Sequence, residues 1–275
     1  MNLSNALKNI NATVNEPITK PKDLSKEYHI KAFIITLLND SASMIGARKC
    51  IQSIKDTGSM IAPFIVDAST PTTMRQDLNY VYDTQTARSI QYTWPIDSKD
   101  DGLDFKTGLY KKTYKAADWK RVMACSVSHM KLWKTCVDIN EPIMILEHDA
   151  IFNACFKLRH LTDNGFKNHI CGINDPMGAT RKWKVFRTKA LENNHKGMYT
   201  CPTVDELGDI PLPQGLAGNS AYVISPFCAK QLLDKVKELG IWPNDAVMCK
   251  QLFPWLQIMV PFYTTLQGIK STTTG

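Results

Sequence analysis

The chain has 275 residues, of which 44% are hydrophobic and 21% are charged. This composition is that of ordinary globular domains, and it excludes disordered, collagen-like and coiled-coil proteins. A chain of this length buries a substantial core, either as one large α/β domain or as two small ones. Basic residues outnumber acidic ones by 33 to 26, and the net charge of +7 favours anionic partners such as nucleotide phosphates, nucleic acid or acidic membrane surfaces.

The positive charge is concentrated in two stretches of the sequence. Residues 106–134 contain eight basic residues and a single acid, Asp118. Residues 181–196 contain a second group. Such stretches indicate either an anion-binding surface or simply a solvated face, and the sequence leaves both interpretations open.

Eight cysteines are spread along the chain, and no two of them form a C-x-x-C pair. No secretory leader precedes them, so we expect reduced thiols in a cytoplasmic protein. No stretch approaches the roughly 18 apolar residues of a membrane span, and we therefore expect no integral membrane segment.

Residues 1–28 are polar and predict an N-terminal arm or irregular segment, followed by a single folded domain over 29–275. The apolar run 32–37 predicts a central strand, and 39–41 supplies the cap of a helix that ends at Gly58. One face of that helix should carry Ile45, Cys50, Ile51 and Ile54. A second strand over 63–68 completes a βαβ unit, which predicts a parallel sheet.

Residues 70–115 are weakly patterned, with one expected strand at 90–94. Apolar residues three and four apart then predict an amphipathic helix over 116–137. The next strand, 143–146, is so apolar that both of its faces must be covered, and it runs directly into Glu147 and Asp149.

The last third of the chain also alternates between expected strands and helices or loops. A strand is expected at 169–173, and the Gly-, Pro- and charge-rich segment 174–218 predicts a loop-rich insertion over the site. A strand at 221–224 leads to a helix capped by Ser225, and a final strand spans 257–262. The pattern predicts an α/β fold with a mostly parallel central sheet flanked by helices.

Two acids at the end of a buried strand are the central chemical feature. Ligands of open α/β sheets bind at the carboxyl ends of the strands, where Glu147 and Asp149 are expected. Carboxylate oxygens suit Mn²⁺ or Mg²⁺, and such an ion bridges and neutralises a departing diphosphate. The alternative is that the two acids merely cap a following helix.

Four segments resemble one known family. They are 124–133 (ACSVSHMKLW), 141–150 (EPIMILEHDA), 218–225 (GNSAYVIS) and 243–245 (PND). In the same order, glycosyltransferase family 25 has a Ser-His-x-x-Leu-Trp helix, a strand ending Glu-Asp-Asp, a Gly-x-x-Ala-Tyr-x-Ile-Ser strand and a Pro-x-Asp turn. The likeness covers roughly 31–262, with clear motifs from 123 to 150 and from 218 to 245.

The resemblance implies a GT-A-like (Rossmann-like) fold, a UDP-sugar donor and inverting transfer to a hydroxyl. By position, Asp149 would be the main metal ligand, with Glu147 on the outer shell of the metal or on the ribose. His148 stands where the family has Asp; a neutral imidazole ligates Mn²⁺, but the lost carboxylate should weaken Mg²⁺ binding. Asp245 is the candidate base that takes the acceptor proton, with a helix N-cap as its alternative role.

Other residues are candidates for holding the donor. Ser128 and His129 either contact the donor or bond neighbouring backbone. Uracil and ribose should lie near Thr36, Asn39 and Asp67, at the ends of the first two strands, while phosphate could meet Arg48 or Lys120.

The two basic stretches flank the predicted site in sequence, which suits a polyanionic acceptor. The small size and divergent motifs also resemble bacteriophage enzymes that glycosylate hydroxymethylcytosine. We therefore hypothesise transfer of glucose or arabinose to 5-hydroxymethylcytosine in phage DNA, in the host cytoplasm, with the base flipped out of the duplex.

Two other functions are consistent with the same sequence. A lipopolysaccharide or capsule glycosyltransferase would use the positive charge to lie against anionic lipid. A non-catalytic nucleotide- or DNA-binding module would have lost activity through the change at His148.

Overall fold

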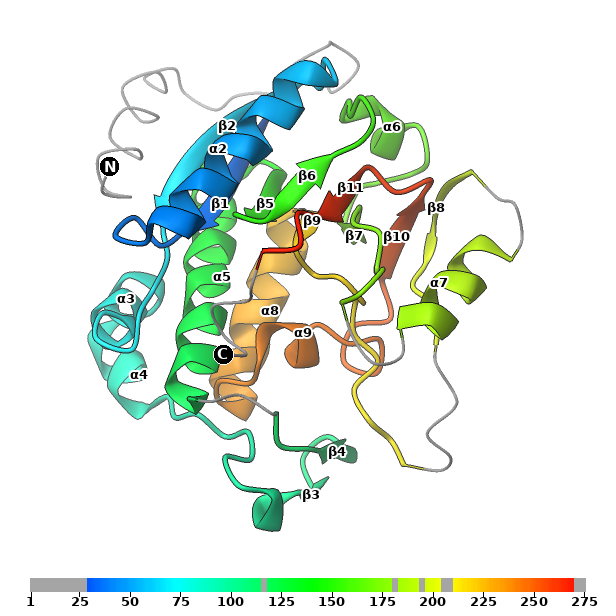
Figure 1. The fold of residues 1–275 in the computed structure, drawn as a ribbon. Coiled ribbons are helices and arrows are strands. Elements are labelled where there is room, and N and C mark those ends of the chain that lie inside the picture. The colour runs from blue at the N-terminus through cyan, green and yellow to red at the C-terminus, as the bar shows by residue number, and fades with distance from the viewer. Residues whose placement is uncertain (1–28, 115–117, 180–182, 193–195, 204–209, 270–275) are drawn as a thin grey trace.

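The computed structural model describes residues 29–114, 118–179, 183–192, 196–203 and 210–269, so the arm expected at 1–28 lies outside the described residues. Within these ranges the main sheet has seven strands in the order β2-β1-β5-β9-β7-β10-β8 (Figure 1). Their bounds are β1 Ile30–Thr36, β2 Ile61–Asp67, β5 Ile143–Glu147, β7 Ile170–Gly172, β8 Gly197–Thr200, β9 Ala221–Ile224 and β10 Leu256–Val260.

The sheet is mixed, with one dominant strand direction. β1 pairs in parallel with β2 and β5, and β7 pairs in parallel with β10. β9 is antiparallel to both β5 and β7, and β8 is antiparallel to β10. The expected α/β fold with a mostly parallel central sheet flanked by helices is confirmed, with two reversed strands that the sequence pattern does not reveal.

The opening βαβ unit forms as expected. The carboxylate of Asp40 accepts a hydrogen bond of 2.7 Å from the Ser43 amide and so caps α2 (Ser41–Asp56), which ends before Gly58 at φ 62°. The expectation that Ile45 faces the core is wrong: its side chain is 52% exposed. The buried face of α2 instead uses small residues such as Gly46 and Ala47, which let the helix lie close to the sheet.

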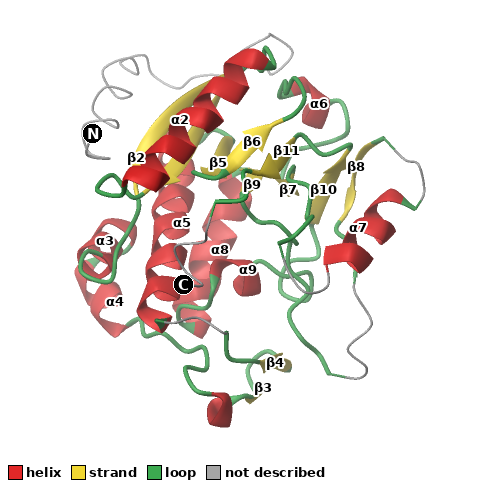
Figure 2. Cartoon of the chain, viewed as in Figure 1, coloured by secondary structure: helices red, strands yellow, loops and turns green. Residues whose placement is uncertain are grey.

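Helices cover both faces of the sheet (Figure 2). α5 (Trp119–Ile139) and α8 (Pro226–Leu239) pack on one face, against Ile143, Ile145 and Tyr222. α2 covers the opposite face together with the small sheet of β6 (Ala150–Phe152) and β11 (Thr264–Leu266). Ser225 caps α8 as predicted, with Pro226 in its first turn.

Residues 70–115 hold more structure than the sequence indicates. They form α3 (Met74–Val81), α4 (Thr84–Ser89), a 3-10 turn over Ser98–Asp100, and the hairpin β3 (Gly102–Asp104) with β4 (Leu109–Lys111). The strand expected at 90–94 is wrong, because Tyr92 makes only an isolated bridge to Ile241. Ile90 and Trp94 are buried in the core, and Tyr92 is partly buried against it, without forming a strand.

The segment 174–218 is not simply a loop. It contains α7 (Trp183–Leu191) and the edge strand β8, which extends the main sheet beyond β10. Two further short helices are α6 (Arg159–Thr162) and α9 (Asn244–Val247). Among the helices of the described ranges, none has the length and apolar character needed to cross a bilayer.

Candidate active site

The carboxyl ends of three parallel strands meet at one edge of the sheet. Glu147 of β5 pairs with Ile35 of β1, and the next residue of β1, Thr36, pairs with Asp67 of β2. The parallel register therefore brings Thr36, Asp67 and Glu147 together, as the sequence predicts. This edge is where open α/β sheets bind ligands.

Asp149 lies in the turn between β5 and β6, directly after the edge. Its Oδ1 atom is buried and has no hydrogen-bond partner among the described residues. Burial, followed by the nearby charge of Glu147, raises the pKa of the Asp149 carboxyl to about 7. A buried carboxylate oxygen without a partner marks a place where a cation fits.

His129 faces Glu147 from α5. Its imidazole is fully buried, Nδ1 lies 2.9 Å from the Tyr222 hydroxyl oxygen, and Nε2 lies 3.5 Å from Oε1 of Glu147. The structure thus brings two predicted site residues together, and it adds Tyr222 as a partner that sequence reasoning missed.

Cys125 is a second residue that the sequence did not single out as a ligand. One turn of α5 before His129, its sulfur lies within 4.8 Å of ligand atoms of both His129 and Glu147. The i, i+4 spacing of Cys125 and His129 on an amphipathic helix was the available signal. Burial, then the charges of three nearby carboxylates including Glu147, raise the pKa of the Cys125 thiol, so the sulfur stays protonated. The carboxylate of Asp149 is not a member of this group.

Asp245 approaches the same group from α9. The Tyr114 hydroxyl donates a hydrogen bond of 2.7 Å to its Oδ1 atom. Pro243 occupies the N-cap position of α9, and no side chain caps that helix, so Asp245 is not its cap. Burial raises the pKa of Asp245, the Tyr114 hydrogen bond lowers it, and the nearby charge of Glu147 raises it again.

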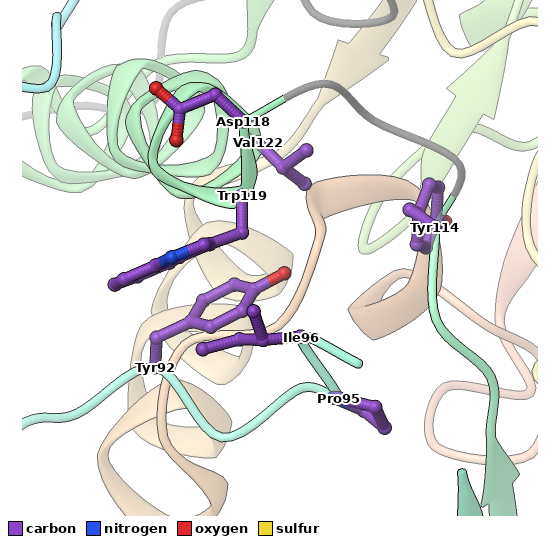
Figure 3. A pocket seen from close by; sticks show the side chains of 7 residues that line it. All are labelled: Tyr92, Pro95, Ile96, Tyr114, Asp118, Trp119 and Val122. Carbon is purple, nitrogen blue, oxygen red and sulfur yellow. The ribbon is translucent and has the colours of Figure 1, made fainter. Parts of the chain in front are cut away.

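An aromatic pocket is lined by Tyr114 together with Tyr92 and Trp119 (Figure 3). Tyr92 and Trp119 stack with ring centroids 5.3 Å apart, and Tyr114 faces them across the pocket. Tyr114 therefore connects the pocket to the candidate base. The remaining lining residues are Pro95, Ile96, Asp118 and Val122.

Two residues predicted to contact the sugar donor, Ser128 and Thr36, form hydrogen bonds within the protein. Ser128 is 2% exposed; its hydroxyl accepts a 2.8 Å hydrogen bond from the Ser69 amide and donates one of 3.0 Å to the Ala124 carbonyl. Thr36 is fully buried and its hydroxyl donates to the Ile34 carbonyl. For Ser128, the bond to Ala124 is the contact with neighbouring backbone that the sequence leaves open as its alternative role.

The other predicted donor residues are open to solvent. Asn39, Asp67, Arg48 and Lys120 are exposed. Asp67 accepts a long hydrogen bond of 3.4 Å from the Leu38 amide, and Lys120 lies over the Trp119 ring. In the described part of the chain, neither Arg48 nor Lys120 forms an ion pair, so both cations remain available to an anion.

The His148 turn is tightly packed against α2. A Cβ atom added at Gly46 would lie 2.9 Å from the His148 carbonyl oxygen, so only glycine fits there. From the C-terminal side, the Gln267 amide donates to the Asp149 carbonyl, and its side chain donates to the carbonyls of Gly46, His148 and Ala150. Burial lowers the pKa of His148 and favours its neutral form.

Asn219 is a further residue that sequence reasoning did not assign. Its side chain is 9% exposed, and both of its polar atoms are without hydrogen-bond partners in the described regions. The adjacent Ser220 carbonyl accepts the Glu147 amide at 2.8 Å, which puts Asn219 beside the same turn.

Fewer cations of the two basic stretches are available to an anionic partner than the sequence suggests. Several of their cations are paired within the fold: Lys111 with Asp104, Lys131 with Asp77, Lys134 with Asp138 and Arg187 with Asp175. Lys112 and Lys120 are exposed, and Lys120 lies over the Trp119 ring, whereas Lys115, Arg181 and Lys182 lie outside the described residues.

Comparison with known proteins gives one family. The family described as glycosyltransferase family 25 (LPS biosynthesis protein) matches residues 109–248, just over half of the chain, and this range includes Glu147, Asp149 and Asp245. No curated protein matches the chain. Among solved structures, the apo crystal structure of mouse xyloside xylosyltransferase 1 matches at 12% identity, covering 86% of this chain and 85% of that chain, with a TM-score of 0.35.

Proposed function

The chain belongs to glycosyltransferase family 25, and on this premise we propose that it moves a sugar from a UDP-sugar to an acceptor hydroxyl with inversion. The observation that carries the proposal is the pair of acids, Glu147 and Asp149, at the end of a buried strand. The unpartnered Oδ1 atom of Asp149 supports a cation there.

The residues present fit a divalent cation such as Mn²⁺ or Mg²⁺. Asp149 would hold it directly, and Glu147 would lie in its outer shell or on the ribose. His148, kept neutral by burial, is compatible with Mn²⁺. When bound, such an ion neutralises the charge that develops on the departing diphosphate.

The nucleoside diphosphate would extend from this turn across the ends of β1 and β2. Asn39 and Asp67 are exposed there and can bond ribose or uracil, while Thr36, Ser128 and His129 shape the floor of the site from beneath. Arg48 and Lys120 are the cations available to phosphate.

Asp245 is the proposed base. It must lose its proton before it can take one from the acceptor hydroxyl, and the Tyr114 hydrogen bond stabilises the ionised form against the cost of burial. Tyr114 lines the aromatic pocket and is hydrogen-bonded to Asp245, so an acceptor bound in the pocket would have its hydroxyl near this base.

For the acceptor we propose 5-hydroxymethylcytosine in DNA, as found in phages, with glucose or arabinose as the sugar. The aromatic rings support this choice, because a flipped base stacks on such side chains. The exposed Lys120, which lies over the Trp119 ring, can meet a flanking phosphate. The internal pairing of Lys111, Lys131 and Lys134 leaves fewer cations for the duplex than the net charge indicates.

A lipopolysaccharide glycan is the second candidate acceptor. The description of the matching family as an LPS biosynthesis protein favours it. Aromatic rings also stack on the apolar faces of sugars, so the pocket fits this acceptor as well.

The test is to incubate the protein with Mn²⁺, a panel of UDP-sugars, and duplex DNA containing hydroxymethylcytosine. Unmodified DNA is the matched control, and deacylated lipopolysaccharide is the alternative acceptor. We expect the mass of one sugar to be added to the hydroxymethylated strand alone. A mass gain on lipopolysaccharide alone would replace the DNA acceptor, and an absence of both transfer and UDP release would indicate a non-catalytic binding module.

A further inference from the structure

A buried series of polar contacts runs from α5 to the Glu147 carboxylate. The indole Nε1 of Trp133 donates a hydrogen bond of 2.9 Å to the Tyr222 hydroxyl oxygen, and that oxygen lies 2.9 Å from Nδ1 of His129. The Trp133, Tyr222 and His129 side chains are all fully buried. At the end of the series, Nε2 of His129 faces Oε1 of Glu147 at 3.5 Å.

The position of the protons in this series follows from the donors and acceptors available. An indole N–H can only donate, so the Tyr222 oxygen accepts from Trp133. The Tyr222 O–H proton then needs an acceptor of its own, and among the described residues Nδ1 of His129 is in reach. Because Nδ1 accepts this bond, the proton of the neutral imidazole is on Nε2.

We propose that His129 is a positioning residue whose Nε2–H is directed by Tyr222 at Glu147 and fixes one oxygen of that carboxylate at the edge of the sheet. The role rests on the proposed function, in which Glu147 supports the cation or the ribose. The present distance of 3.5 Å is longer than an ordinary hydrogen bond, and a movement of about 0.5 Å closes it. Nε2 has no hydrogen-bond partner in the described ranges, and Oε1 of Glu147 is the carboxylate oxygen that faces it.

The same atoms raise a competing interpretation. Cys125, His129 and Glu147 come close enough together to suggest a site for a thiophilic ion such as Zn²⁺. That site needs a lone pair on Nε2, so the ring proton would have to move to Nδ1. The buried Tyr222 O–H would then lose its acceptor, which is costly in the protein interior. The hydrogen-bond pattern therefore favours a donor at Nε2 over a ligand.

The experiment is long-range ¹H–¹⁵N NMR of the histidine rings in the metal-free protein, with the His129 signals assigned through His129→Gln. We expect the neutral ring with its proton on Nε2. Tyr222→Phe removes the hydroxyl that fixes the tautomer, so a mixture should appear. Trp133→Phe is the matched control: it removes the indole donor but leaves the Tyr222 hydroxyl, and the Nε2–H form should persist.

A second readout tests the contact with Glu147. Glu147→Ala should shift the Nε2–H resonance, whereas Cys125→Ser should leave it in place. With UDP and Mn²⁺, Tyr222→Phe should weaken binding about 10- to 100-fold, the range seen when a supporting partner of a ligand is lost. His129→Gln, which keeps an N–H near the same position, should retain more affinity than His129→Ala.

Three results would overturn the proposal. One is an Nδ1–H tautomer in the wild type. Another is an Nε2–H resonance whose chemical shift does not change in Glu147→Ala. The third is a result on adding Co²⁺: a cobalt–thiolate absorption band that Cys125→Ser abolishes, with loss of the Nε2–H signal. This result would show that Cys125 and His129 bind a metal. Failure of the proposed function is distinguishable, since it shows as absent UDP release and leaves the NMR signals of the metal-free protein unchanged.

Discussion

The hydroxyl of Tyr114 donates a hydrogen bond of 2.7 Å to Oδ1 of Asp245, across 131 positions of the chain. Tyr114 lines the aromatic pocket, and Asp245 lies near Glu147 and His129, so this bond joins the pocket to the charged turn. It also lowers the pKa of Asp245, against the larger opposing effect of burial.

Replacing Asp245 by Asn should remove the base. An amide cannot take the acceptor proton, so kcat should fall by about 10² to 10⁴-fold while the KM for the donor stays close to that of the wild type. Initial rates measured against donor concentration check this. A comparable loss in donor affinity would show instead that Asp245 holds the nucleotide.

Tyr114→Phe should move the pH profile. The hydrogen bond from Tyr114 lowers the pKa of Asp245, so its removal raises that pKa, and a base must be deprotonated to act. The acidic limb of the kcat/KM profile should therefore shift to higher pH. Tyr110→Phe is the control, because the Tyr110 hydroxyl makes no hydrogen bond in the described part of the chain. A limb that stays in place in Tyr114→Phe would contradict the role of Asp245.

Asp149→Asn should stabilise the metal-free protein above pH 7. The pKa of Asp149 is raised to about 7 from 3.8, so its contribution to stability is present below pH 3.8 and is lost as the pH rises to about 7. A neutral amide avoids this loss. Thermal unfolding at pH 5 and pH 8 tests the sign: the melting temperature of the variant relative to that of the wild type should be higher at pH 8 than at pH 5.

The same carboxylate should make cation binding depend on pH. Protons compete with the cation for Asp149, so Mn²⁺ affinity should fall by about tenfold for each pH unit below 7. Mn²⁺ should raise the melting temperature of the wild type at pH 8 but not that of Asp149→Asn. An equal effect of Mn²⁺ on both proteins would place the cation elsewhere.

Gly46→Ala should disturb the turn that carries His148. The added methyl group would lie 2.9 Å from the His148 carbonyl oxygen and from the Ile269 side chain, so the backbone must shift. We expect a loss of about 1–3 kcal/mol in the free energy of unfolding, with weaker Mn²⁺ binding. Gly102→Ala is the matched control, because no described atom lies within 4 Å of the position that its added methyl group would take. Denaturant titrations compare the two.

Trp119→Ala should weaken binding of the acceptor without changing binding of the sugar donor. If a base or sugar ring stacks on Trp119, its loss should raise the acceptor KM by about 5- to 150-fold, the equivalent of 1–3 kcal/mol per stacked ring. The donor KM should not change. Phe105→Ala removes an aromatic side chain that is 94% exposed and serves as the control. Equal effects of the two variants would mean that the pocket is not the acceptor site.

Local patterns were sufficient to predict much of the fold. Asp40 and Ser225 signal the starts of their helices through short-range hydrogen bonds, and the apolar run before Glu147 requires a strand covered on both faces. The direction of β9 could not be predicted, because a strand buried between two neighbours has the same apolar composition in either direction. The segment around Tyr92 has strand-like residues, but only Ile90 and Trp94 are buried in the core, and Tyr92 makes an isolated bridge to Ile241.

The candidate site also contains some residues that local sequence patterns predict and others that they do not. The positions of Glu147 and Asp149 could be predicted because Glu147 ends a buried strand, Asp149 follows two residues later, and the end of such a strand lies at the ligand edge. The contacts of Tyr222 with His129 and of Tyr114 with Asp245 join residues 93 and 131 positions apart, and no local periodicity reports them. Asn219 became notable only through the missing partners of its buried amide.

The most direct test of the account is a crystal structure of the protein with UDP and Mn²⁺, in which anomalous scattering locates the ion. We predict manganese bonded to the Asp149 carboxylate and to the diphosphate, with the nucleoside across the ends of β1 and β2. Manganese and UDP bound away from Asp149, or manganese held by Cys125 and His129, would contradict it.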